Sequence, residues 1–164
     1  MTETELKLRD AEIQLQLAMA NSGNDELVRS CVNSLISAGR SVTFVMQAES
    51  SHPALEQWYR ARMSTLASSP DSGPLLQFFN EARVHSIHKG VVSPEQLTTR
   101  AVDFKINGVL TTARPTVTFY RFNEASRYFP GRSGGVFRMC EEYLSLLRTL
   151  TREWLAKRAE CTTP

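Results

Sequence analysis

The sequence predicts a mainly α-helical protein, a bundle of five helices with a small antiparallel β-hairpin or meander inserted before the last helix. Two patterns predict this fold. Apolar residues recur at helical spacing in five separate stretches. Over about residues 100–122 the pattern changes to alternation, and Asn107-Gly108 is the dipeptide that best fits a two-residue hairpin turn. The length of 164 residues fits a single domain, 1–164.

The first two helices have the clearest patterns. Residues 4–21 carry two neighbouring apolar stripes, one formed by Leu6, Ile13, Leu17 and Ala20 and the other by Leu8, Ala11, Leu15 and Met19. A second helix is expected to begin at Asn24, a capping residue followed by two acidic residues. Its apolar positions alternate steps of four and three, as in a helix that packs lengthwise on a partner: Val28, Val32, Leu35, Gly39, Val42 and Met46. Gly39 is expected to let that partner approach closely.

Three further helices complete the predicted bundle. Pro53 suits the first turn of the third helix. The fourth covers residues 74–90, PLLQFFNEARVHSIHKG, and is expected to stop near Gly90. The last begins at Val136 and is expected to end near Arg158, with a frayed terminus beyond it.

The segment between the fourth and last helices contains three extended runs. Residues 102–106 and 109–112 flank the predicted turn, and pairing 106 with 109, 104 with 111 and 102 with 113 places their apolar side chains on one face. A third run, 116–122, follows Pro115. The runs are expected to form a hairpin or a three-stranded meander.

The composition indicates a protein of the cytoplasm that is not embedded in a membrane. Cys31, Cys140 and Cys161 have no paired spacing, so neither a disulfide framework nor a zinc site is expected, and the first two lie on apolar stripes as core thiols do. No signal peptide and no membrane-spanning run is apparent. The histidines have no neighbours at metal-ligand spacing, so neither a metal nor another cofactor is expected.

Basic residues concentrate in the second half of the chain. From Arg100 to Arg138, seven basic residues stand against two acidic ones, a net charge of +5. Such a segment can attract a polyanion such as RNA, and Arg114 and Arg121 are candidate substrate-binding residues within it. An exposed hairpin whose charges keep its edges soluble fits the same residues.

The end of the fourth helix carries residues of catalytic type. Arg83, His85, His88 and Lys89 lie within one short stretch, which holds two of the three histidines of the chain. Basic residues at the C-terminal end of a helix also interact favourably with the helix dipole, so a solvated helix end without function fits the cluster as well.

The spacing of Arg83 and His88 resembles the signature of the HEPN superfamily, an arginine and a histidine separated by four to six residues near the end of a bundle helix. Residues 38–45, AGRSVTFV, and the helix with Trp58-Tyr59 are similar to the helices that precede that signature. The resemblance covers the helical parts and not the β-segment.

The resemblance implies a homodimeric HEPN-like bundle with metal-independent RNA endonuclease activity, in toxin–antitoxin, phage-defence or RNA-processing settings. Arg83 and His88 match the signature positions and are the implied catalytic residues. RNA is the implied substrate, and a cognate antitoxin or regulatory protein is a further partner. Val84 stands where active members often have a polar residue.

The chemistry of these residue types suits RNA cleavage by the 2′-hydroxyl of the substrate. That reaction needs a base, an acid and a cation beside the phosphate. Histidine titrates near neutrality and exchanges protons, and arginine binds phosphate oxygens without losing its charge. Together they require no metal.

Arg83 and His88 point in different directions on an ideal helix, about 140° apart. Either the helix ends before His88, or two protomers form a shared cleft around the fourth helix. We expect the shared cleft, since a two-fold interface supplies two histidines. His85 and Lys89 are then expected to contact phosphates beside it. A non-catalytic dimeric module that binds RNA or a partner protein is the alternative.

Overall fold

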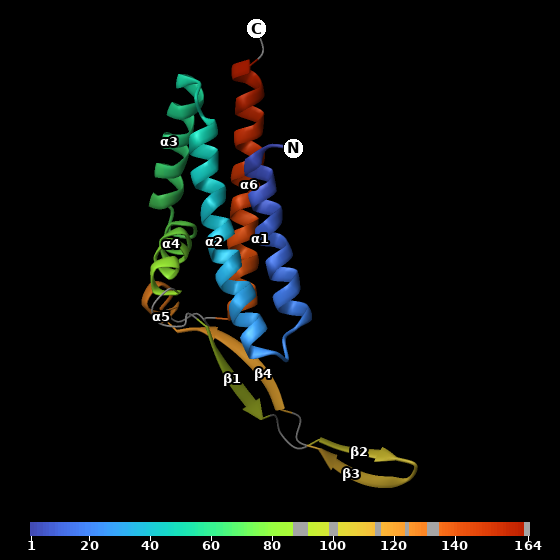
Figure 1. Ribbon diagram of the computed structural model, residues 1–164. Coiled ribbons are helices and arrows are strands. Elements are labelled where there is room, and N and C mark those ends of the chain that lie inside the picture. Colours follow the sequence, from blue (N-terminus) through green and yellow to red (C-terminus); the bar gives the residue numbers. More distant parts are fainter. Residues whose placement is uncertain (87–91, 99–101, 114–115, 124, 131–134, 163–164) are drawn as a thin grey trace.

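Helices form the body of the protein, and a β-ribbon leaves one end of it (Figure 1). The computed structural model describes residues 1–86, 92–98, 102–113, 116–123, 125–130 and 135–162. The long helices α1 (Glu3–Ala20), α2 (Asp25–Glu49) and α6 (Val136–Thr162) run side by side, while α3 (Pro53–Ser68) and α4 (Gly73–Ser86) follow one another along the remaining side. The prediction of a helical bundle is confirmed.

The helices begin where the sequence supplies caps. The Asn24 side chain accepts a hydrogen bond from the Leu27 N–H at the start of α2. Pro53 occupies the first turn of α3, and His52 Nδ1 accepts from the Ala54 N–H. These side chains satisfy backbone donors that have no partner inside the helix.

Helix α1 begins with a reciprocal cap. The Thr2 hydroxyl accepts from the Glu5 N–H at 3.2 Å, and Glu5 Oε2 accepts from the Thr2 N–H at 2.6 Å. The hydrogen bond from the Thr2 backbone lowers the pKa of Glu5. Because the folded-state pKa is depressed, this contribution to stability is present above the usual carboxyl pKa and is lost as the pH falls through the folded value.

Replacing Glu5 with glutamine is therefore expected to make the free energy of unfolding less sensitive to acid. Between about pH 6 and about pH 3, the wild type loses the cap contribution of the carboxylate, less than about 1 kcal/mol for an exposed group, and Glu5→Gln does not. Urea unfolding at the two pH values measures the difference. An equal loss of stability in both proteins would contradict this account of the cap.

The predicted seam of α2 forms the centre of the core. Every member is buried: Val28, Val32, Leu35, Gly39, Val42 and Met46. A Cβ atom at Gly39 would lie 2.6 Å from Cε1 of Tyr143 in α6, so the expected close approach of a partner helix at Gly39 is confirmed. The Tyr143 ring in turn stacks on Phe79 of α4 at 4.1 Å. Gly39 thus fixes the spacing between α2, α6 and α4.

Only one of the two apolar stripes of α1 is buried. Leu8, Ala11 and Leu15 pack into the bundle together with Ala18. Met19, which the sequence placed on the same stripe, is instead 44% exposed. Leu6, Ile13 and Leu17 lie on the opposite face, with exposed fractions of 37%, 42% and 45%. Helix α1 therefore carries apolar surface on both faces.

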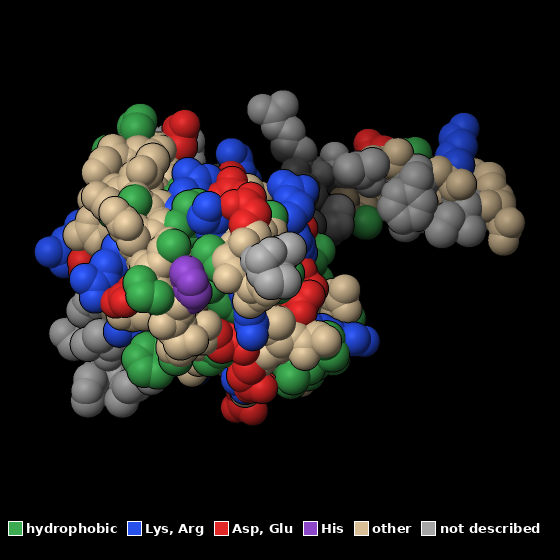
Figure 2. All heavy atoms as spheres, turned by 90° about the horizontal axis from the view of Figure 1, so that it is seen from above, with side chains coloured by type: hydrophobic (Ala, Val, Ile, Leu, Met, Phe, Trp, Pro, Cys, Tyr) green, Lys and Arg blue, Asp and Glu red, His purple; other side chains and the backbone are tan. Residues whose placement is uncertain are grey.

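Polar contacts join the helices near the end of the bundle that holds both termini. Trp154 Nε1 donates to the Ser50 hydroxyl, and the Arg62 guanidinium binds both carboxylate oxygens of Glu153 at 2.7 and 3.0 Å. Seen from that end, acidic and basic side chains are interspersed over the surface (Figure 2). No helix of the described residues is both long and apolar enough to cross a membrane.

The β-hairpin has the predicted register. Strands β2 (Val102–Ile106) and β3 (Val109–Ala113) pair antiparallel, with Ile106 opposite Val109 and Val102 opposite Ala113. Asn107 and Gly108 at the turn have φ values of 52° and 84°. Positive φ at both central residues matches the twist of the strands, which explains the Asn-Gly dipeptide.

The three-stranded meander is wrong. Strand β4 (Thr116–Phe122) pairs with β1 (Val92–Thr98), and the two sheets of the described residues have the orders β1–β4 and β2–β3. Strand β1 was not predicted because Ser93-Pro94 suggests a break. Pro94 lies opposite Tyr120, and in a two-stranded sheet each strand is an edge, where proline is tolerated.

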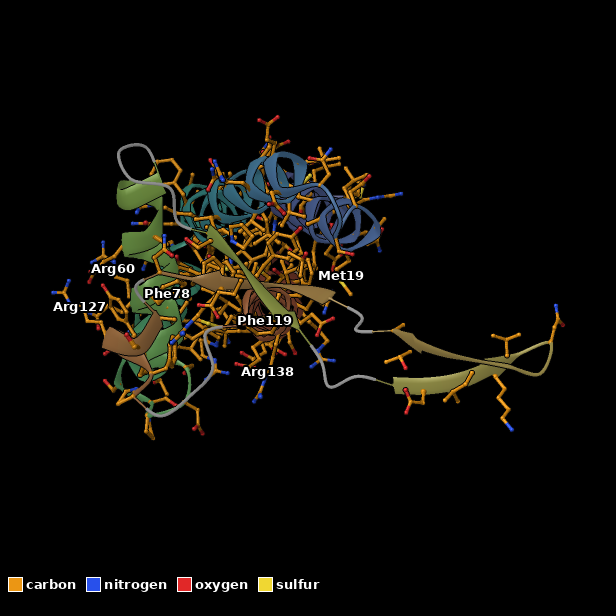
Figure 3. The ribbon with its side chains drawn as sticks, turned by 90° about the horizontal axis from the view of Figure 1, so that it is seen from below. Met19, Arg60, Phe78, Phe119, Arg127 and Arg138 are labelled. Carbon is orange, nitrogen blue, oxygen red and sulfur yellow. The ribbon has the colours of Figure 1, made fainter. Side chains whose placement is uncertain are left out.

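The base of the ribbon is fixed to the bundle. Phe122 is buried, and the Tyr120 hydroxyl lies 2.9 Å from Oδ1 of Asp25 at the start of α2. The β2–β3 hairpin extends away from the helices, and Val109 and Leu110 beside its turn are 66% and 64% exposed (Figures 1 and 3).

Two helix predictions need correction near the C-terminus. A short helix, α5 (Ala125–Tyr128), follows β4, so the described residues have a sixth helix besides the five predicted. Helix α6 extends to Thr162 rather than ending near Arg158. The Lys157 ammonium pairs with Glu160 at 2.8 Å and the Thr162 hydroxyl donates to the Arg158 carbonyl, which stabilise the additional turn.

Candidate functional site

The predicted site residues lie at the ribbon end of the bundle. Arg83 and His85 belong to the last turn of α4, where the structure describes the backbone. His88, Lys89 and Arg114 lie outside the described residues, so their roles stay predictions.

Aromatic packing holds this end of α4 in place. Phe78 and Phe79 are 2% and 1% exposed and contact the rings of Phe122, Tyr128, Phe129 and Tyr143. The Tyr128 hydroxyl also donates to Glu81. The helix turn that leads to Arg83 is therefore attached to α5, α6 and the base of the ribbon, a rigid support for side chains that must be positioned.

An open groove lies beside this part of α4, between α2 and α3. Its volume is about 290 Å³, and its lining residues are Arg40, Thr43, Phe44, Gln47, Tyr59 and Asn80. We call it the Arg40–Phe44 groove. The Phe44 ring is 72% exposed. Among the described residues, it is the one aromatic side chain in the set of exposed large apolar residues.

Polar contacts order the floor of the Arg40–Phe44 groove. Arg40 Nη1 donates to the Asn80 carbonyl at 3.2 Å, and the Tyr59 hydroxyl donates to the Thr43 carbonyl at 2.8 Å. Burial raises the pKa of Tyr59, so this hydroxyl stays protonated as a donor. An exposed aromatic ring and a guanidinium in one groove can bind a nucleic-acid strand, the ring by base stacking and the guanidinium by phosphate contact.

The groove adjoins the position of Arg83. Asn80 and Arg83 are three residues apart on α4 and are therefore neighbours on the helix surface. Arg40 and Phe44 were not predicted as site residues because they come from another helix than Arg83. The signal that could have found Phe44 is its place outside the buried seam, since an aromatic residue between Val42 and Met46 but off their stripe must face away from the core.

Three arginines in the described part of the basic segment have a partner within the chain. Arg121 in β4 is exposed, but its Nη1 lies 3.4 Å from Glu95. Arg138 pairs with Glu142 at 3.0 Å, and the Arg127 guanidinium lies over the Tyr128 ring. Figure 3 shows Arg127 and Arg138 pointing outward at different places. The role of Arg121 in substrate binding stays a prediction.

The predicted core thiols are confirmed. Cys31 and Cys140 are free and buried, and burial raises the pKa of the Cys140 thiol, so it is protonated and unreactive. Over the described part of the chain, no three His, Cys, Asp or Glu side chains are grouped as a metal ion would require.

Comparison of the chain with protein-family models, with curated proteins and with solved structures found no match. The HEPN resemblance therefore rests on the spacing of Arg83 and His88 and on the helices before them.

Proposed function

We propose that this chain is a metal-independent RNA endonuclease of HEPN type, with Arg83 and His88 as catalytic residues. The observation that supports the proposal most is the Arg40–Phe44 groove, which offers a stacking surface and a cation beside Asn80, one turn before Arg83. A single strand of RNA lying in this groove would place a phosphate at the end of α4.

We propose that His88 and Arg83, at the C-terminal end of α4, carry out the cleavage. His88 takes the proton of the 2′-hydroxyl, whose oxygen forms a new bond to phosphorus while the bond from phosphorus to the 5′-oxygen breaks. The protonated His88 then gives a proton to the departing 5′-oxygen. The Arg83 guanidinium stabilises the added negative charge on the phosphate oxygens. The products are a 2′,3′-cyclic phosphate and a 5′-hydroxyl.

We propose that these residues act within one chain rather than in a cleft shared by two. This arrangement requires α4 to end before His88, since Arg83 and His88 point about 140° apart on an ideal helix. The large apolar residues in the described part of α4 are buried and form no apolar surface for a partner: Leu75, Leu76, Phe78 and Phe79. The exposed large apolar residues of the described chain belong to α1, α2 and the hairpin, besides Met1.

Replacing Phe44 with alanine is expected to weaken the binding of single-stranded RNA by about 5- to 150-fold, because base stacking on an aromatic ring contributes about 1–3 kcal/mol. Fluorescence anisotropy with labelled RNA measures the affinity, in a His88→Ala background that prevents cleavage. The matched control is Leu110→Ala, which removes an apolar side chain of similar exposure, 64% against 72%, from the hairpin. Equal affinities for both variants would show that the groove does not hold the RNA.

The second candidate is a non-catalytic module that binds RNA or a partner protein. Val84, beside the proposed catalytic arginine, and the exposed Phe44 ring favour it. It predicts binding that survives His88→Ala and no cleavage product with any RNA.

A further inference from the structure

A second pocket lies between α3 and α4, next to the Arg40–Phe44 groove. Its volume is about 530 Å³, which is within the range of about 300–1,000 Å³ typical of pockets that bind small organic groups. We call it the Glu81 pocket, after the carboxylate that lines it. Asn80 lines both the pocket and the groove, so the two adjoin one another along α4.

The walls of the Glu81 pocket are apolar. Met63 and Ala67 line it from α3, and Pro74 and Leu76 line it from α4. A Cβ atom at Gly73 would lie 2.4 Å from the Ala67 carbonyl oxygen, so glycine lets the start of α4 approach the end of α3 closely. Apolar walls with a methionine thioether suit a flat aromatic ring, since sulfur makes favourable contacts with such rings.

Two donors hold the Glu81 carboxylate in place. Oε1 accepts a hydrogen bond from Nε2 of Gln77 at 2.9 Å, and Oε2 accepts one from the Tyr128 hydroxyl. The Tyr128 ring in turn packs edge-on against Phe78, with 5.5 Å between the ring centroids. A carboxylate has about four acceptor sites, so Glu81 can accept further hydrogen bonds through both oxygens. The pocket therefore contains a positioned pair of acceptors beside apolar walls.

The chemistry of this pair of acceptors selects among the four RNA bases. Guanine presents two adjacent donors on its Watson–Crick edge, the N1–H and the 2-amino group. Adenine and cytosine each present one donor beside an acceptor, and uracil presents one donor between two acceptors. Because an ionised carboxylate only accepts, guanine is the base that can bind both of its oxygens at once.

We propose that the Glu81 pocket binds a guanine base of the RNA strand that lies in the Arg40–Phe44 groove, an assignment that rests on the proposed function for its RNA substrate. The two ends of a guanine nucleotide suit the two adjoining sites. Its donating base edge meets the Glu81 carboxylate, and its negative phosphate meets the Arg40 guanidinium in the groove.

The order of residues around α4 fits a strand that leads from the pocket to the proposed catalytic end. With about 100° per residue, Glu81 lies about 100° to one side of Asn80, and Arg83 lies about 60° to the other side. A strand that runs from the pocket to the end of α4 therefore passes over Asn80. Cleavage is expected at a fixed distance in the RNA sequence from a guanine.

Binding of RNA strands that differ at one position tests the base preference. The strands are oligouridines with guanine, inosine or adenine at the centre, and fluorescence anisotropy measures their dissociation constants in the His88→Ala background. The guanine strand is expected to bind about 5- to 150-fold more tightly than the adenine strand, the usual effect of a bidentate contact to a base. Inosine lacks the 2-amino donor and is expected to bind with intermediate affinity.

Glu81→Gln tests the carboxylate itself. The amide replaces one of the two acceptors by a donor, so the affinities for the guanine and adenine strands are expected to become equal. Glu56→Gln is the matched control, because it removes the same charge from α3, where Glu56 pairs with Arg60 outside the pocket. This control should keep the guanine preference. Circular dichroism verifies that both variants are folded.

Equal affinities of the His88→Ala protein for the guanine and adenine strands, or a guanine preference that survives Glu81→Gln, would overturn the assignment of the pocket. Guanosine monophosphate that binds as tightly as the guanine strand would overturn the assignment to a base within a strand. Wild-type cleavage at positions unrelated to guanine would overturn the pocket and keep the nuclease. Guanine preference without any cleavage product would support the pocket and contradict the nuclease.

Discussion

His88→Ala is expected to lower the rate of RNA cleavage by about 10²- to 10⁴-fold, because the 2′-hydroxyl loses the base that takes its proton. Arg83→Ala is expected to have an effect of similar size, since the guanidinium stabilises charge that develops in the transition state. Single-turnover cleavage of a labelled RNA measures both rates. His52→Ala is the matched control, because that histidine caps α3 and should leave the rate unchanged.

Mixing the two inactive variants tests the placement of the site within one chain. If Arg83 and His88 act in the same chain, a mixture of Arg83→Ala and His88→Ala stays inactive. Recovered cleavage would mean that two chains share the site, as the sequence pattern first suggested, and would contradict the single-chain arrangement without contradicting the nuclease activity.

Gly39→Ala is expected to lower the free energy of unfolding by about 1–3 kcal/mol, although alanine is the better helix former by about 1 kcal/mol. The added Cβ would lie 2.6 Å from the Tyr143 ring. That ring cannot move aside freely, because it stacks on Phe79 with an interplanar angle of 4°. Overpacking at this point therefore separates α2 from α6.

The control for Gly39→Ala is Gly23→Ala in the turn after α1. No atom lies within 4 Å of a Cβ at Gly23, so this variant should keep the stability of the wild type. Chemical unfolding measures both. If Gly39→Ala were as stable as Gly23→Ala, the close contact between α2 and Tyr143 would not constrain the fold.

The helices and the hairpin were predictable because their signals are local. The Asn24 cap, the α2 seam and the Asn107-Gly108 turn each specify structure within a few residues. Strand β1 was not predictable in this way. Its partner β4 is distant in sequence, and Pro94 removes the local signal of a strand.

The candidate site was predictable only in part, for the same reason. The spacing of Arg83 and His88 is visible in a short stretch of sequence. The hydrogen bond from Arg40 to the Asn80 carbonyl joins α2 to α4, which are far apart in the sequence. The carboxylate partner Glu95 of Arg121 was not predictable either, because it comes from the unpredicted strand β1. The apolar stripe with Leu6, Ile13 and Leu17 was visible as a pattern, but only the fold shows that it faces outward.

The most direct test of the account is the incubation of the purified chain with single-stranded RNA in excess EDTA, followed by analysis of the product ends. We expect products with 2′,3′-cyclic phosphate and 5′-hydroxyl ends, and no cleavage of the same sequence made with 2′-deoxyribose. The absence of cleavage with every RNA, or cleavage of the deoxyribose strand at the same rate, would contradict the proposed function.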